Sequence, residues 1–248
     1  GDIYIFDAFG TAHRKQASTH SAIQQAKSSC AGLLLEKEIN SLNKALTSIE
    51  SPFTAVIAGS KISTKLELIA HLNSKADFII VGGGIANTFL KSQGFNVGES
   101  LVENDMIEIA EELFNSSKII LPNKVIVADS IDSNYPTIKN IDSVSSSDKI
   151  FDINLSSNMS EILKSSKTIL WNGPIGVFEK EPFQKGTHQL ATTIAKSKAF
   201  SLAGGGETIA AINKFINKDE VSYCSTGGGA FLEYMEGKIL PSIEALGG

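Results

Sequence analysis

The chain has 248 residues, of which 42% are hydrophobic and 20% charged, and its formal net charge is −5 at pH 7. The apolar share supplies a buried core and excludes disordered and fibrous classes of protein. The acidic balance argues against a sequence-independent binder of nucleic acid or anionic membranes. Because no apolar run approaches the roughly 18 residues of a membrane span and no signal peptide opens the chain, we expect a soluble protein.

Short apolar runs alternate with helical stretches along the chain, which opens on such a run without a lead-in, so we expect missing sequence upstream of Gly1. Most runs are apolar at nearly every position, which is typical of strands buried on both faces of a parallel sheet. With helices between them, they predict an α/β fold: a doubly wound, mostly parallel sheet with helices on both faces. The runs are residues 3–6, 54–58, 77–81, 118–121, 124–128, 167–171, 199–203 and 221–225.

The segments between the runs differ in character. Apolar residues recur at three- and four-residue steps over residues 31–49 and 102–114, which predicts two amphipathic helices. Ser51-Pro52 ends the first of them and marks a boundary. Residues 129–160 are rich in Ser, Asp and Asn, and predict a surface excursion, a loop with an edge hairpin. The two cysteines, Cys30 and Cys224, are expected to be buried thiols in a reducing cytoplasm.

Glycine turns follow several of the predicted strands. Parallel strands end at one edge of a sheet, and open α/β sheets bind ligands at that edge. Because glycine lacks a Cβ, the backbone can approach a ligand closely, while the helix that follows directs free N–H groups at it. The sequence therefore predicts a ligand site there. The turns are Ala58-Gly59-Ser60, Gly82-Gly83-Gly84, Gly204-Gly205-Gly206 and Gly227-Gly228-Gly229.

The turns match none of the common phosphate or hydrolase motifs. The dinucleotide spacing with its later acidic residue, the Walker-type loop, the protein-kinase signatures and G-x-S-x-G are all missing from the sequence. Arg14 is the only arginine among 22 basic residues, so lysines and backbone N–H groups must do most of any anion binding. Of the kinds of ligand site considered, a mononucleotide site built from separate glycine turns is the one that remains.

A few polar residues stand beside the turns. Lys61 and Lys65 are four apart after Gly59, which predicts that they share a helix face directed at the glycine edge, or else form an ordinary solvated pair. Glu207 and Thr208 follow a glycine turn directly, where they suit either a helix cap or a site for Mg²⁺ and phosphate. The histidines lack the spacing of a metal site or a catalytic triad.

Six segments in the chain have a specific combination of order and spacing: DAFGTAHR (7–14), GSKISTK (59–65), VGGGIANTFL (81–90), WNGPIGVFE (171–179), AGGGET (203–208) and STGGGAFLEYMEGKILP (225–241). They resemble the motifs of the phosphoglycerate kinase family. That family has two α/β lobes, the amino-terminal one holding 3-phosphoglycerate and the carboxyl-terminal one holding ADP or ATP with Mg²⁺. The resemblance implies a remnant of the amino-terminal lobe at residues 1–30, an interdomain helix at 31–50, the nucleotide-binding lobe at 51–235 and a tail returning toward the other lobe at 236–248.

The activity implied is reversible phosphoryl transfer between 1,3-bisphosphoglycerate and ADP, giving 3-phosphoglycerate and ATP in glycolysis. The resemblance also implies Mg²⁺ as cofactor and a cytoplasmic protein, monomeric when complete, with no nucleic-acid or membrane partner. An alternative is an isolated ATP- or ADP-binding module without turnover, because the substrate lobe is missing. An NAD-dependent oxidoreductase is the third and weakest reading.

The resemblance assigns roles to residues at the matching positions. Lys61 and Lys65 would hold the α-phosphate and the transferring phosphoryl group, and Glu179 the ribose hydroxyls. The nucleotide-binding set implied is Gly59, Lys61, Lys65, Gly82, Gly83, Gly84, Asn172, Glu179, Gly204, Gly205, Gly206 and Thr208. The catalytic set is Lys65, Gly206 and Gly228. Arg14 and His13 would bind the acid substrate, and Glu207 would bind the metal where the family usually has Asp.

Overall fold

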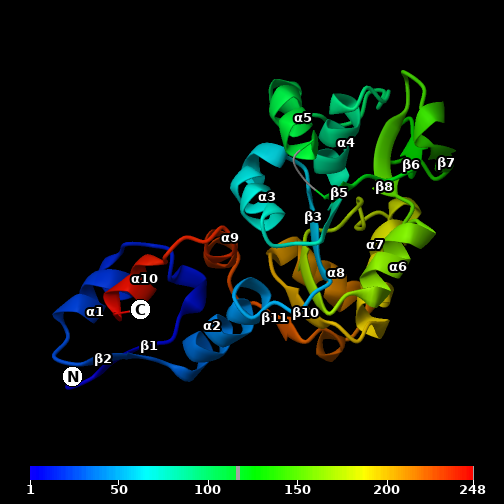
Figure 1. Ribbon diagram of the computed structural model, residues 1–248. Helices are drawn as coiled ribbons and strands as arrows, with labels where there is room; N and C mark the ends of the chain where they lie inside the picture. The colour runs from blue at the N-terminus through cyan, green and yellow to red at the C-terminus, as the bar shows by residue number, and fades with distance from the viewer. Residues whose placement is uncertain (116–117, 248) are drawn as a thin grey trace.

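The computed structural model describes residues 1–115 and 118–247 and shows an elongated molecule with a smaller and a larger body (Figure 1). Both chain ends lie in the smaller body, and helices α2 (Leu33–Leu46) and α9 (Gly229–Met235) lie between the two. Residues 116, 117 and 248, which the predicted nucleotide lobe and tail include, lie outside the described residues.

Within the described residues, the main sheet of the larger body has six parallel strands in the order β11-β10-β9-β3-β4-β5. Each corresponds to a predicted apolar run, so the predicted mostly parallel α/β fold is confirmed. Burial on both faces of the sheet explains why the strands are apolar at nearly every position: Phe53, Val56 and Ile57, in one of the two middle strands, are all 0% exposed. The strands are β3 (Phe53–Gly59), β4 (Phe78–Gly82), β5 (Ile119–Ile120), β9 (Thr168–Asn172), β10 (Phe200–Ala203) and β11 (Tyr223–Cys224).

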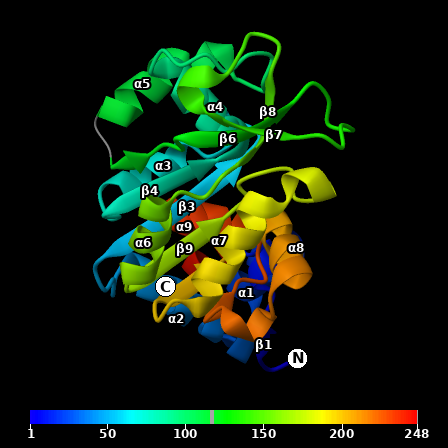
Figure 2. The same ribbon diagram turned by 90° about the vertical axis from the view of Figure 1, so that its right-hand side faces the viewer.

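Helices cover both faces of this sheet (Figures 1 and 2). One group packs together on one side, where α9 contacts α2 and α3, and α4 contacts β3 and β4. The other group is a row in which α7 contacts both α6 and α8. The remaining bounds are α3 (Leu66–Asn73), α4 (Gly83–Ser92), α5 (Ile107–Asn115), α6 (Ser157–Ser165), α7 (Lys185–Lys196) and α8 (Gly206–Phe215), with short 3-10 helices at Ile62–Thr64, Asn104–Met106, Ile141–Ser143, Glu181–Phe183 and Lys218–Glu220.

Strand β6 (Lys124–Ala128) lies outside the main sheet, in an antiparallel sheet with β7 (Thr137–Asn140) and β8 (Lys149–Ile153). Only Leu121–Asn123 separate β5 from β6, which is too short for the dozen or so residues that a parallel crossover needs.

The prediction of a surface excursion over residues 129–160 is wrong in part. This segment includes β8, whose Ile150, Asp152 and Ile153 are buried, and helix α6.

The smaller body has two parallel strands, β1 (Tyr4–Phe6) and β2 (Ser29–Ala31). Helix α10 (Pro241–Ala245) contacts the short helices Ala17–Ser21 and α1 (Ala22–Gln25), whereas the short helix Phe9–Thr11 contacts α2 and α9. Ser242 anchors α10, because its N–H donates to the Ala12 carbonyl at 3.1 Å and its hydroxyl to the Thr19 carbonyl at 2.5 Å. The carboxyl-terminal segment thus packs against the amino-terminal one. The division into lobes stays a prediction.

Cys224 is buried, but Cys30 is exposed in β2, so the prediction of two buried thiols is wrong for Cys30. Its strand has only β1 as a described neighbour and is partly open to solvent. Among the described residues, no helix combines the length and apolar character needed to cross a membrane.

Candidate functional site

A cavity of about 500 Å³ opens at the carboxyl edge of the main sheet. The turn after β3 contributes Gly59 and Ser60 to its lining, and the turn after β4 contributes Gly83 and Gly84. The size is that of a small-molecule site. The other lining residues are Asn87, Glu99, Ser100, Leu101, Ile131, Lys149, Ile150, Phe151, Pro174, Gly176, Val177, Glu179 and Glu207.

The first two glycine turns lie against each other. Gly59 and Gly83 form an isolated parallel bridge, and a Cβ at Gly83, whose φ is +63°, would lie 2.6 Å from the Gly59 carbonyl oxygen. A Cβ at Gly84 would overlap the Ser60 carbonyl oxygen. Only glycine allows this approach, which brings two backbones to one wall of the cavity. Gly82 lies behind that wall, buried against Ile175.

Side chains join the turns after β9 and β10. The Thr208 hydroxyl accepts a hydrogen bond from the Gly173 N–H at 2.8 Å and donates one to the Gly204 carbonyl at 2.8 Å. The Asn172 amide donates to the same carbonyl at 2.7 Å. Thr208 and Asn172 are 1% and 3% exposed, so their polar atoms act inside the protein and fix one turn to the other.

Lys65 lies beneath these turns. Its ammonium group donates to the Ala58 carbonyl at 2.6 Å and to the side-chain oxygen of Asn172. Burial lowers the pKa of Lys65 to about 8, against the opposing effect of the Glu207 charge. The ammonium is thus held by neutral oxygens, within electrostatic reach of one carboxylate.

The prediction that Lys61 and Lys65 share a helix face is wrong. Lys61 is extended, with φ −133° and ψ 125°, the buried Ile62 starts a 3-10 turn, and α3 begins only at Leu66. Lys61 is exposed. Desolvation acts to raise the pKa of Glu103, but hydrogen bonds from Ser63 and Ile62, with a smaller contribution from the Lys61 charge, hold that pKa below its usual range. The structure therefore separates the two lysines into a solvated and a half-buried one.

The amino terminus of α8 faces open space beside the cavity. Gly205, with φ +96°, precedes the helix, and a Cβ at Gly206 would meet no atom within 4 Å. Glu207, in the first turn, lines the cavity. Free N–H groups and the positive end of the helix dipole make such a terminus favourable for an anion.

The fourth glycine turn lies apart from the cavity. A Cβ at Gly227 would lie 2.6 Å from the Phe9 ring, and one at Gly229 would lie 2.9 Å from Nε2 of His13, whereas Gly228 faces open space. Arg14 is exposed, and its Nε lies 3.4 Å from the same His13 nitrogen. The structure thus brings the two predicted substrate residues to this turn, outside the cavity.

Helix α2 holds the same turn through a buried carboxylate. Glu38 is 0% exposed and accepts hydrogen bonds from the Thr226 N–H at 2.6 Å, the Thr226 hydroxyl at 2.6 Å and the Ser225 hydroxyl at 3.0 Å. The helix between the two bodies is therefore connected directly to the glycine turn that precedes α9.

The family model for phosphoglycerate kinase matches residues 1–238. The chain belongs to the phosphoglycerate kinase family. It is 49% identical to the phosphoglycerate kinase of Coxiella burnetii over 253 aligned residues, covering 99% of this chain and 65% of that protein, and 50% identical to that of Francisella philomiragia, with the same coverage. The solved Coxiella burnetii structure superposes with a TM-score of 0.94 at 49% identity, and the Pyrococcus horikoshii enzyme with 0.85 at 33%. These structures cover 99% of this chain, which spans 65% and 64% of theirs.

The predicted metal residue, Glu207, places one carboxylate in the lining of the cavity. No group of three His, Cys, Asp or Glu side chains that could hold a metal ion occurs in residues 1–115 and 118–247. Mg²⁺ at phosphoryl-transfer sites is commonly held by one or two carboxylates together with substrate phosphates. The exposed Glu207 carboxylate at the cavity therefore fits that kind of site.

Sequence reasoning missed the far wall of the cavity. Lys149, Ile150 and Phe151 of β8 line it, with residues 99–101 and Ile131. An ion pair between Lys149 and Glu99 at 3.2 Å joins two of these segments, and one between Lys180 and Asp132 at 2.7 Å joins the segment at Ile131 to the loop that contains Glu179. The apolar residues of the KIFDI stretch were the available signal, and the polar composition around it concealed them.

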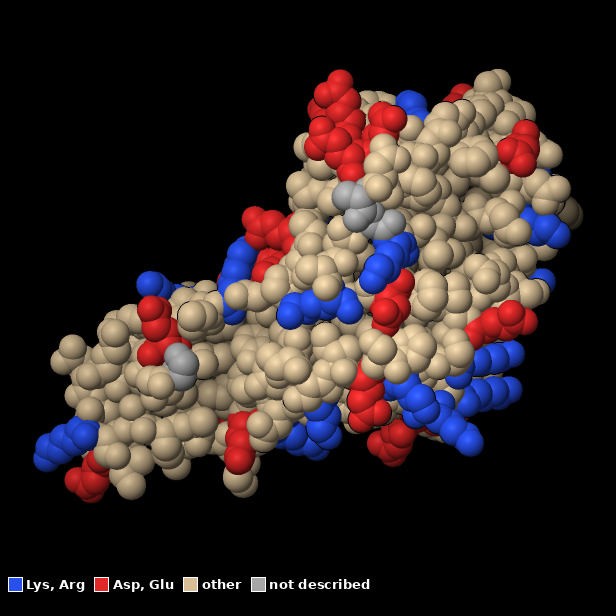
Figure 3. Space-filling model, in the orientation of Figure 1, with Lys and Arg blue, Asp and Glu red and all other residues tan. Residues whose placement is uncertain are grey.

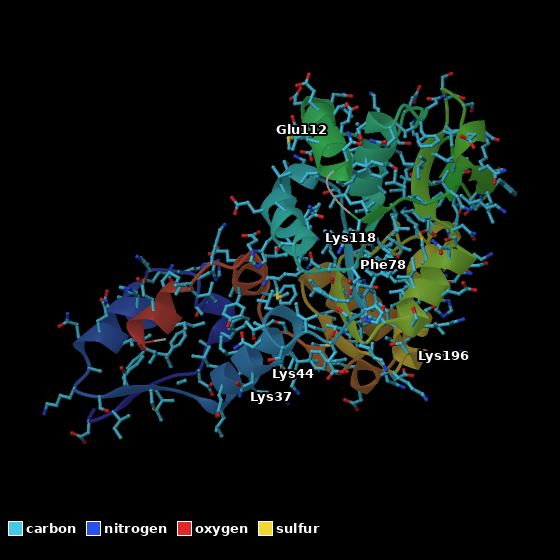
Figure 4. The ribbon with its side chains drawn as sticks, viewed as in Figure 1. Lys37, Lys44, Phe78, Glu112, Lys118 and Lys196 are labelled. Atoms are coloured by element: carbon cyan, nitrogen blue, oxygen red, sulfur yellow. The ribbon has the colours of Figure 1, made fainter. Side chains whose placement is uncertain are left out.

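A group of lysines lies along another edge of the molecule. On the face shown in Figure 3, lysines gather along the lower edge and acidic side chains over α5. Figure 4 places Lys37, Lys44 and Lys196 in that lower region. Lys44 lies 5.3 Å from the ring centre of Phe200, which begins β10, so this edge carries the amino ends of strands. Lys44 and Lys196 lie in the last turns of α2 and α7, where a cation complements the helix carboxyl terminus.

Proposed function

We propose that the cavity binds ADP or ATP, and that the chain is the nucleotide-binding part of a phosphoglycerate kinase that transfers a phosphoryl group reversibly between 1,3-bisphosphoglycerate and ADP. One observation carries the proposal: glycine turns from neighbouring parallel strands meet around one cavity, with Lys65 and the open amino terminus of α8 at its border. Membership of the family supports it.

The lining suggests how the nucleotide lies. Leu101, Ile150, Phe151 and Val177 offer an apolar wall for the base, next to the glycine backbones. Glu179 is exposed in the cavity and suits the ribose hydroxyls. The phosphates would then lie toward Gly205 and Gly206, where the α8 N–H groups favour anions. Asn172 and Thr208 would act by fixing the turns.

The proposed reaction needs little proton transfer from the protein. An ADP phosphate or a substrate carboxylate is already ionised near neutral pH, so no general base is required. The chain would position the reacting groups and neutralise their charge. Lys65 and the amino terminus of α8 would neutralise the transferring group, and closure of the two lobes would exclude water. On the substrate side, His13 and Arg14 remain the proposed residues, and the open Gly228 remains a proposed catalytic residue that faces the transferring group.

Glu207 would hold Mg²⁺ in this scheme, together with the nucleotide phosphates. The bound ion would neutralise phosphate charge. Glutamate is one methylene longer than the family aspartate, so the carboxylate starts farther from the helix backbone. A cytoplasmic, monomeric protein without nucleic-acid partners remains part of the proposal.

Isothermal titration of the purified chain with MgADP tests the binding step. We expect one saturable site, with no heat for NAD under the same conditions. Glu179→Ala should weaken binding, and the exposed Glu161→Ala, on α6, serves as the matched control. A titration of folded protein without heat for either adenine nucleotide would refute the proposal.

A second candidate, a nucleotide-binding module without turnover, is favoured by the position of His13, Arg14 and Gly228 outside the cavity. A coupled assay with 3-phosphoglycerate and ATP separates the two. Measurable turnover supports the kinase for this chain, whereas saturable MgADP binding without turnover supports the module.

A further inference from the structure

A buried carboxylate lies directly behind the wall of the cavity. Asp152 in β8 is 1% exposed and follows Phe151, which lines the cavity. Two glycines give it room, because a Cβ at Gly176 or at Gly186 would overlap its Oδ1 atom. Gly176 itself lines the cavity, so its backbone separates the Asp152 carboxylate from the ligand space.

The carboxylate is bound to backbone N–H groups. The Gly186 N–H donates to Oδ2 at 2.7 Å, and the Ile153 N–H donates to Oδ1 at 2.8 Å. Gly186 is the second residue of α7, so Asp152 caps this helix from a neighbouring strand. Both carboxylate oxygens are therefore used as acceptors.

This arrangement has an energetic cost. Burial raises the pKa of Asp152 to about 7, while the two N–H groups and the Lys185 charge act in the opposite direction. No ion pair of Asp152 occurs among the described residues. A buried acid without a contacting cation is unfavourable for stability, so a capping role alone would be served at lower cost by a neutral cap such as serine.

The loop that Asp152 contacts forms one side of the site. Pro174, Gly176, Val177 and Glu179 all line the cavity. The Val177 N–H donates to the Phe151 carbonyl at 2.8 Å, which holds the loop to β8 next to Asp152. A shift of the Gly176 backbone would move both the apolar wall at Val177 and the Glu179 carboxylate.

We propose that Asp152 is a positioning residue for the nucleotide: without touching the ligand, its carboxylate fixes the Gly176 backbone against β8 and thereby sets the places of Val177 and Glu179. The inference rests on the proposed function, because it takes the cavity to be the nucleotide site. An asparagine at this position would keep one acceptor but turn an NH₂ group toward the other N–H. An alanine would remove both acceptors and leave a void beside Gly176.

MgADP affinity, measured well below each variant's melting temperature, tests the inference. We expect the Kd to rise about tenfold in Asp152→Ala and a few-fold in Asp152→Asn, since small displacements of positioning groups are costly. The exposed Asp142→Asn controls for the loss of a carboxylate. Ser156→Ala controls for the loss of a helix cap, because the Ser156 hydroxyl caps α6 by accepting from the Met159 N–H at 3.1 Å. It should lower the melting temperature and leave the Kd unchanged.

A further variant keeps the test decisive if the Asp152 variants fold poorly. Gly176→Ala retains Asp152 and the α7 cap, but its Cβ must push the loop away from the carboxylate. We expect a raised Kd in this variant, and a non-additive effect when it is combined with Asp152→Asn. The proposal is overturned if folded Asp152→Asn or Gly176→Ala binds MgADP within about twofold of the unmodified protein, a difference too small for a positioning role. Absence of binding in the unmodified protein would instead refute the proposed function.

Discussion

The ammonium group of Lys65 binds the side-chain oxygen of Asn172, and so connects the end of β3, through the Ala58 carbonyl at 2.6 Å, with the end of β9. Its contacts with Ala58 and Asn172 are to neutral oxygens. The charge of Lys65 is therefore not cancelled by an ion pair in the described part of the chain, and it is available to an anion arriving at the glycine edge.

Lys65→Ala should reduce turnover on the order of a hundredfold, the typical cost of removing one group that stabilises transition-state charge. MgADP affinity should change little, because Lys65 does not belong to the cavity lining and would act on the transferring group. The measurements are kcat in a protein that carries both lobes of the family, and calorimetric Kd. Lys91→Ala, which removes an exposed lysine bonded to Asn104, is the control. Unchanged kcat would remove Lys65 from the mechanism.

The lowered pKa of Lys65 also predicts a pH dependence of stability. Its pKa is about 8 in the folded protein, against about 10.4 in an unfolded chain. Between these values the unfolded state binds more protons, so the contribution of Lys65 to the free energy of unfolding rises with pH and is constant below about pH 8. Urea unfolding of the unmodified protein and of Lys65→Met at about pH 7.5 and about pH 9.5 measures the difference. An identical pH slope in both proteins would contradict the assigned pKa.

Two buried threonines give opposite predictions for one substitution. Thr208→Val removes the hydroxyl that joins Gly173 to Gly204, so it should destabilise the fold by about 2 kcal/mol, because the buried Gly173 N–H loses its acceptor while the Gly204 carbonyl keeps only the Asn172 amide. Thr187 on α7 is 0% exposed, and its hydroxyl has no hydrogen-bond partner among the described residues. Thr187→Val should therefore be neutral or stabilising.

Denaturant unfolding of both variants, compared with the unmodified protein, provides the measurement for the two threonines. Equal destabilisation by the two substitutions would show that the Thr208 bridge contributes nothing beyond the general cost of the change.

The Glu207 assignment predicts a loss of metal dependence. In the unmodified protein, Mg²⁺ should strengthen ADP binding, and Glu207→Gln should reduce that gain severalfold, because a neutral amide is a weaker ligand for a hard cation. Glu207→Asp should retain it in part. Calorimetric titration with ADP, once in the presence of Mg²⁺ and once in the presence of a chelator, gives the ratio of the two Kd values. An unchanged ratio in Glu207→Gln would place the metal on other groups.

The sequence predicts the main sheet well because burial on both faces leaves a continuous apolar signature, as in β3 and β9. It also places the glycine turns on one edge, since that follows from parallel strand direction. The conformation around Lys61 was not predictable from spacing. A four-residue step implies a shared face only inside a helix, and burial of Ile62 produces a short 3-10 turn there instead.

The role of β8 was concealed for a different reason. Ser, Asp and Asn around residues 149–153 make the segment resemble a surface loop, and the buried Asp152 counts as polar in any pattern. Its burial depends on two glycines distant in sequence, Gly176 and Gly186, which only the folded chain brings to it. Local composition does not contain that information.

Gly206→Ala separates a ligand role of the α8 terminus from a structural one. A methyl group there meets no atom within 4 Å, and the position is the first residue of the helix, where alanine is at least as favourable as glycine, so stability should stay equal or rise by up to about 1 kcal/mol. If phosphates approach the α8 N–H groups, the same methyl group occupies their space and MgADP affinity should fall. Gly173→Ala is the contrasting variant: with φ +103° and a Cβ that would overlap the Ala58 carbonyl oxygen, it should lower stability strongly. Melting temperature and calorimetric Kd measured on both proteins decide the matter, and a Gly206→Ala protein with normal affinity would exclude close phosphate contact at this terminus.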